Sequence, residues 1–142
     1  MNKDKIDQLF FEYETAFDAL DMRTIAQHYP DHFISAGPKG TIAQDKKEFL
    51  DKADQASAMY KSLGQNSAKI ISKKITEISN EYSLVTVHWG VTFQKTGNEV
   101  IEFDVSYIVQ EIDDRPSIIL FITHQDEAEA MKKLGLEPEL IS

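Results

Sequence analysis

The chain has 142 residues, a length that suits one compact domain, so we predict a single domain spanning residues 1–142. Its 15 Lys and Arg against 24 Asp and Glu give a net charge of -9, which repels a phosphate backbone, and we expect no nucleic-acid partner. Since the chain has no cysteine, disulfides, thiolate nucleophiles and cysteine-ligated zinc are excluded.

The first residues and the apolar runs both argue against a membrane. The N-terminal stretch "MNKDKIDQLFFEYE" has acidic residues where a signal sequence needs an apolar core. The longest aliphatic run, Ile118 to Ile122, is far too short to span a bilayer. We therefore expect a cytoplasmic protein without membrane contact, which suits the lack of cysteine.

Helical periodicity dominates the first third of the chain. Apolar residues recur every three or four positions up to residue 20, which predicts an amphipathic helix. Asp21 suits the N-cap of a second, short helix through Ile25 and Tyr29, which Pro30 ends. After a strand from Phe33 to Ala36 and the turn "GPKG", Thr41 and Gln44 have the spacing of a capping box, which predicts a third helix ending at Gly64.

From Asn66 onward the period changes to two and β-branched residues dominate. This predicts four strands, at Ala68 to Ile78, Ser83 to Gln94, Glu99 to Ile112 and Ser117 to Thr123, joined by turn sequences that suit antiparallel hairpins. A short helix is predicted from Asp126 to Leu134. Helices followed by long strands indicate an α+β fold, with a curved antiparallel sheet wrapped around the N-terminal helices as a cone-shaped barrel.

Alternation along two strands predicts which face of the sheet points inward. Val85, Val87, Trp89, Val91 and Phe93 share one face, while His88 shares the other. In the next strand Phe103 and Tyr107 point inward and Asp104 outward, so that His88 and Asp104 can pair on the outer face. The last strand, "SIILFIT", is apolar on both faces, and we expect a second subunit to cover its outer side.

Three stretches carry a resemblance to a known family: "FEYETAFDALDMRTIAQHYPDHFISAGPKG", "VTVHWGVTF" and "FITHQDE". Together with the order of elements, they resemble the nuclear-transport-factor-2-like superfamily, which includes ketosteroid isomerase and SnoaL-like polyketide cyclases. The resemblance covers nearly the whole chain. It implies a cystatin-like cone with an apolar pocket and a homodimer through the outer sheet face.

The resemblance to ketosteroid isomerase also implies roles for single residues. Tyr13 falls on the tyrosine that donates to the substrate oxyanion, and Tyr107 falls close to the second donor. The general base falls on Gly37, which has no side chain. Because proton abstraction needs that base, we expect no standard ketosteroid isomerase activity.

We expect the ligand pocket to be lined by Tyr13, Phe17, Tyr60, Trp89, Phe103, Tyr107 and Phe121. The catalytic candidates are Tyr13, Tyr107 and His124; the last can titrate near neutral pH. A purely structural role for each is the alternative, with the tyrosine hydroxyls bonded to each other, to water or to backbone.

No metal or cofactor site is expected. Pro30 lies between His28 and His32 and breaks the helical spacing that a metal pair needs. Nothing matches a glycine-rich phosphate loop, a nucleophile elbow or a zinc-protease helix. The leading hypothesis is a domain that binds a small apolar ligand, with an unidentified isomerase, cyclase or hydrolase activity left open. The alternative is a non-catalytic dimerisation or regulatory association domain.

Overall fold

The computed structural model describes residues 3–97 and 99–126. Its elements follow in the order α1 (Lys3–Asp18), α2 (Met22–Ala26), β1 (His32–Gly37), β2 (Gly40–Asp45), α3 (Lys46–Ser62), β3 (Gln65–Glu77), β4 (Tyr82–Phe93), a 3₁₀ turn (Gln94–Thr96), β5 (Val100–Ile112) and β6 (Arg115–Thr123). The terminal helix predicted from Asp126 to Leu134 lies, except for its first residue, outside the described part of the chain.

The six strands form one sheet in the order β2-β1-β6-β5-β4-β3. Four of the five pairings are antiparallel, and β1 pairs with β6 in parallel. The sheet is therefore mixed, which corrects the all-antiparallel prediction. It also stays open, because β2 and β3 remain as edges and no barrel closes.

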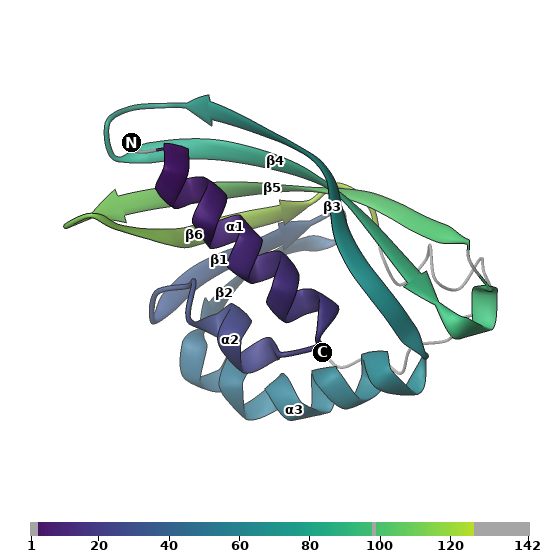
Figure 1. Cartoon of the computed structure of the whole chain (residues 1–142). Helices are drawn as coiled ribbons and strands as arrows, with labels where there is room; N and C mark the ends of the chain where they lie inside the picture. Colours follow the sequence, from purple (N-terminus) through teal and green to yellow (C-terminus); the bar gives the residue numbers. More distant parts are fainter. Residues whose placement is uncertain (1–2, 98, 127–142) are drawn as a thin grey trace.

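The long strands bend around α1, which lies across the concave face of the sheet, and α2 and α3 pack against each other beside it (Figure 1). Strand β3 contains two register shifts against β4, at Gln65/Ser67 and at Ile70/Ser72. Such bulges increase the local twist and bend a strand. The predicted α+β class and the curved sheet around N-terminal helices are confirmed.

The helix ends follow from local sequence. Asp21 caps α2 as predicted, since its carboxylate accepts from Thr24 N at 3.2 Å. Leu20 just before it has φ 57°, a left-handed conformation that ends α1 and turns the chain. Gly64, with φ 77°, does the same after α3.

The predicted capping box at Thr41 and Gln44 is wrong. Both residues belong to β2, which forms a hairpin with β1 in which Thr41 pairs with Ala36 and Gln44 pairs with Phe33. The N-cap of α3 is Asp45, whose carboxylate accepts from Lys47 N at 2.7 Å. The six-residue strand β2 has neither alternating polarity nor alternating burial, so its sequence does not distinguish it from the start of a helix.

The buried face of the sheet is the one that the alternation predicted. Val85, Val87, Trp89 and Phe93 are all fully buried, and on β5 the side chains of residues 101, 103, 105, 107 and 109 are buried too. The apolar stripe of α1, from Ile6 to Ala16, covers this face.

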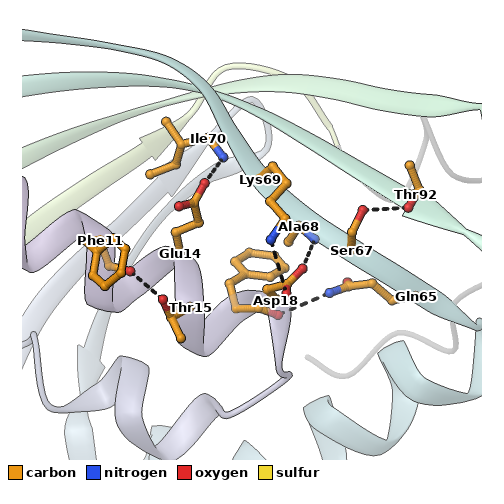
Figure 2. A network of polar contacts seen from close by, with 11 residues as sticks. Phe11, Glu14, Thr15, Asp18, Gln65, Ser67, Ala68, Lys69, Ile70 and Thr92 are labelled. Atoms are coloured by element: carbon orange, nitrogen blue, oxygen red, sulfur yellow. Dashed lines mark hydrogen bonds and ion pairs between the residues drawn. The ribbon is translucent and has the colours of Figure 1, made fainter.

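Carboxylates of α1 satisfy the free edge of β3 (Figure 2). Glu14 Oε2 accepts from Ile70 N at 2.6 Å, and Asp18 Oδ1 accepts from Ala68 N at 2.9 Å. Asp18 also forms an ion pair with Lys69 at 3.4 Å. Since amides of alternate residues point away from the neighbouring strand, these bonds occupy donors that would otherwise face an unpaired edge.

We expect Glu14→Ala to lower the free energy of unfolding by roughly 1.5 to 3 kcal/mol, the usual contribution of a hydrogen bond to a charged group. Glu14→Gln keeps an acceptor oxygen and should lose less. Urea unfolding measures both, with Thr15→Ala as the control on the exposed side of the same helix. Equal losses for Glu14→Ala and Thr15→Ala would contradict the edge-capping role.

Candidate functional site

An aromatic cluster lies between α1 and the concave face of the sheet. Tyr13 of α1 lies at its centre, with ring centroids 5.7 Å from Tyr107, 6.0 Å from Trp89 and 6.3 Å from Tyr29. Phe17, one helical turn along, is 5.2 Å from Trp89. Four of the seven predicted pocket residues therefore lie in direct contact, because the apolar stripe of α1 faces the inner side of β4 and β5.

The polar atoms of this cluster form two short pairs. The hydroxyls of Tyr13 and Tyr29 are 2.8 Å apart, and Trp89 Nε1 donates to Tyr107 Oη at 3.0 Å. All four side chains are buried. A hydroxyl that accepts from an indole directs its own hydrogen elsewhere, and in a tyrosine pair only one hydroxyl donates to the other.

Tyr29 is the residue of this site that the sequence analysis did not single out. Burial raises the pKa of its phenol, and the neighbouring Tyr13 and Tyr107 raise it further, so the hydroxyl stays protonated and able to donate. Its position just before Pro30, at the end of the predicted short helix, was the available signal. That signal gives no direction for the side chain.

A rim of half-buried aromatic rings borders the cluster. Phe121 of β6 lies 6.5 Å from Tyr107, and Tyr60 of α3 lies 6.2 Å from Phe17, measured between ring centroids. Both remain partly exposed, as does Phe17. Phe103 is buried and pairs with Trp89 across β4 and β5. All seven predicted pocket residues thus lie in or beside one aromatic interior.

His124 lies apart from this interior. Its Nε2 is 2.7 Å from the hydroxyl oxygen of Ser106, which alternates with the buried Val105 and Tyr107 and so belongs to the outer face. The imidazole is exposed, and the backbone N–H of His124 donates to Asp104 O at 3.0 Å. The structure therefore separates His124 from Tyr13 and Tyr107.

The predicted pairing of His88 with Asp104 on the outer face is confirmed. His88 Nδ1 is 2.7 Å from Asp104 Oδ1, and its Nε2 is 2.9 Å from Glu102 Oε1. The hydrogen bonds to these two carboxylates raise the pKa of His88, and the bond to His88 lowers the pKa of Asp104. This is a solvent-facing charge cluster on the convex side of the sheet.

Gly37 ends β1 beside Thr123, and its lack of a side chain has a steric reason. A Cβ on Gly37 would lie 2.5 Å from Thr123 Oγ1, closer than real Cβ contacts come. The backbone conformation does not require glycine here, because the positive φ of this turn is at Gly40. Asp126 is an acid that lines the same hollow of about 520 Å³ as Gly37, and it is ion-paired with Lys39 at 2.9 Å.

We expect Gly37→Ala to destabilise the fold by roughly 1 to 3 kcal/mol, the usual cost of overpacking. Thr123→Ala removes the clashing oxygen, so the double variant should recover most of that loss. Thermal or urea unfolding of the two single variants and the double variant gives the coupling energy. Additive effects would show that Thr123 is not what excludes a side chain at position 37.

Two further properties concern the described residues as a whole. Within residues 3–97 and 99–126 no three His, Asp or Glu side chains are grouped so that they could hold a metal ion. None of the helices in this part of the chain combines the length and apolarity needed to cross a lipid bilayer.

A helix-filled, strongly bent sheet with an aromatic interior defines the cystatin-like α+β class, and comparison with solved structures agrees. An NTF2-like protein of unknown function from Shewanella oneidensis is similar with a TM-score of 0.72 at 22% identity, over 88% of this chain and 100% of that one. A cystatin-like protein of unknown function from Nostoc punctiforme gives 0.67 at 17% identity, over 87% and 90%. A ketosteroid isomerase-like protein from Erwinia carotovora gives 0.58 at 16% identity, over 87% and 97%.

The family model for NTF2-like protein (DUF6841) matches residues 3–126, and the chain belongs to this family. The resemblance inferred from the sequence is thereby confirmed at the level of the superfamily. A comparison with curated protein sequences finds no match. The solved structures share the fold, and at these identities they say nothing about activity.

Proposed function

We propose that this protein binds a small, mostly apolar molecule bearing a carbonyl or hydroxyl group in the aromatic interior between α1, α3 and the sheet. The observation that carries the proposal is the placement of two hydrogen-bonded pairs, Tyr13 with Tyr29 and Trp89 with Tyr107, inside an otherwise apolar interior. Ligand sites commonly combine an apolar wall with a few convergent polar groups.

The proposed ligand has two ends that match two parts of the interior. Its polar end meets the tyrosine hydroxyls, which both donate and accept hydrogen bonds. Its apolar body contacts the half-buried rings of Phe17, Tyr60 and Phe121. Aromatic walls bury large areas at little cost in side-chain entropy, so this arrangement favours a compact hydrocarbon skeleton.

Binding is proposed ahead of catalysis because, among the described residues, no carboxylate lies where the ketosteroid isomerase pattern puts the general base. Position 37 has no side chain, a Cβ there would lie 2.5 Å from Thr123 Oγ1, and the carboxylate of Asp126 is already ion-paired with Lys39. Proton-abstracting isomerisation of the ketosteroid type needs a positioned base. The cysteine-free composition supports a cytoplasmic location for this function.

Trp89 is the single tryptophan of the chain, so intrinsic fluorescence reports on the proposed site directly. We expect 2-decalone to change this fluorescence saturably and to bind about 3- to 10-fold more tightly than decalin, as one net hydrogen bond predicts. Tyr13→Phe should remove the preference for the ketone.

The matched control is Tyr82→Phe, because Tyr82 lies on the outer face, where its hydroxyl accepts from Gln110 at 2.9 Å. It should leave both affinities unchanged. No saturable response to either probe would rule out a ligand site of this kind. A response that Tyr13→Phe leaves unaltered would place the polar end elsewhere.

The outer face supports a second candidate function, association into a homodimer. Leu84, Ile108, Leu120 and Ile34 are register neighbours across four adjacent strands and form one apolar row. Each is half-buried in the single chain, and Ile122 beside the row is 41% exposed. Interfaces have such an apolar centre, with charged groups at the rim.

We expect light scattering at micromolar concentration to give twice the 16.2 kDa chain mass, and Ile108→Glu to reduce it to one chain. A charge buried at the centre of an apolar interface has no partner and disfavours association. Phe11→Glu is the control, since Phe11 is an equally apolar side chain, 63% exposed on α1. A 16.2 kDa particle for the unaltered protein would refute the dimer and would have no bearing on the ligand proposal.

A further inference from the structure

A second hollow lies beside α1, where the helix meets the residues after α2 and the β5–β6 hairpin. It has a volume of about 540 Å³. Its walls include Lys5, Glu12, Gln27, His28, Arg115 and Ser117. The volume is within the range of small-molecule sites.

His28 forms the least exposed polar part of this hollow. Its backbone is fixed on both sides, because its N–H donates to Ile25 O at 3.0 Å and its carbonyl accepts from Ile118 N at 2.8 Å. The side chain is only 13% exposed, and Nε2 is buried without a hydrogen-bond partner among the described residues. A buried polar atom of this kind calls for an explanation, since leaving one unsatisfied is costly.

The group nearest to this nitrogen is a carboxylate that does not quite reach it. Glu12 Oε2 is 3.7 Å from His28 Nε2, beyond hydrogen-bond distance, and its other oxygen accepts from Gln8 Nε2 at 3.1 Å. Burial lowers the pKa of His28 despite Glu12, so the imidazole is neutral at pH 7. In the tautomer that carries its hydrogen on Nδ1, the ring and the carboxylate both present acceptors.

Two acceptors side by side, one of them charged, suit a donor of several hydrogens that carries positive charge. A primary ammonium has three such hydrogens and no acceptor of its own. Hydrogen bonds between an ammonium and a carboxylate are also stronger than neutral ones. The pair His28 and Glu12 thus matches an amine.

The two cations of the hollow, Lys5 on α1 and Arg115 on β6, differ in their ion pairs. Lys5 is engaged by Asp114 Oδ1 at 3.2 Å and by Glu111 at 3.8 Å. Arg115 makes no ion pair with another residue in the described ranges, and its guanidinium can bind a carboxylate with two parallel hydrogen bonds.

We propose that this hollow binds a small zwitterionic amine of the amino-acid type, with its ammonium between His28 Nε2 and Glu12 Oε2 and its carboxylate on Arg115. The proposed ligand contacts are other residues than those of the aromatic interior, although the ring of His28 lies 6.3 Å from that of Tyr13, and the proposal does not depend on the function proposed above. It assigns a role to a histidine that the aromatic site does not use.

The test follows the ring signals of His28 by NMR while glycine, β-alanine or γ-aminobutyrate is added to the full chain. The His28→Gln variant identifies those signals among the four histidines. We expect one of these three amino acids, the one whose charged ends have the right separation, to shift the signals saturably. It should bind more tightly than propylamine or propionate, each of which has only one charged end. Glu12→Gln and Arg115→Gln should each weaken binding by roughly 10- to 100-fold.

His32→Gln is the matched control, because His32 is 81% exposed and lies outside the hollow. It should leave the affinity unchanged. Propylamine binding as tightly as the zwitterions would overturn the assignment of Arg115. No saturable shift with any of the three amino acids would overturn the site. A change in the titration of His28 in Glu12→Gln would not rescue it, because that change would show only an ion pair between the two side chains.

Discussion

The packing of α1 into the concave face of β4 and β5 is the interaction on which the rest of the structure depends. Alternation along these two strands places their fully buried side chains, Trp89 and Phe93 among them, on one face, and the apolar stripe of α1 covers it. Removing that much apolar area from water is the dominant favourable contribution in such a domain. The same contact brings Tyr13 between Tyr29 and Tyr107, so the core and the candidate site are one set of residues.

Because the same residues form the core and the candidate site, the interior contains polar atoms. A core needs only apolar side chains of suitable size, whereas Tyr13, Tyr29, Tyr107 and Trp89 each add a polar atom that must be satisfied. Their mutual hydrogen bonds do this locally and fix the rings relative to each other. An interior held together in this way combines a rigid apolar wall with groups that recognise oxygen.

Much of the fold was accessible from the sequence because its signals are periodic and local. The stripe of α1, the cap at Asp21 and the inward residues of β4 and β5 each follow from spacing within one element. Strand β2 is absent from the prediction because its six residues, with Thr41 and Ile42 as the only β-branched pair, are too few to show a strand period. The parallel pairing of β1 with β6 joins residues more than eighty positions apart and has no local signature.

The sequence directs aromatic side chains to one interior but does not fix their mutual geometry. Helical periodicity turns Tyr13 and Phe17 toward the sheet, and alternation turns Trp89, Phe103 and Tyr107 toward the helix. The partner of Tyr13 is Tyr29, whose direction depends on how α2 meets the sheet. His124 follows a strand end, where alternation no longer fixes the side chain, and it turns to Ser106 on the outer face. Gly37 is small because β6 passes close to it, which only the folded chain reveals.

The bonds from Glu14 and Asp18 to the edge of β3 also constrain the order in which the molecule can assemble. The helix that provides these carboxylates is synthesised first, while its partners on β3, β4 and β5 follow 50 residues and more later. Contacts between such distant segments are slow to form, because the intervening loop must close before they contribute. The sheet-facing stripe of α1 therefore gains its partners on β3 only after some 50 further residues have been synthesised, whereas its contacts with α2 form between near neighbours in the chain.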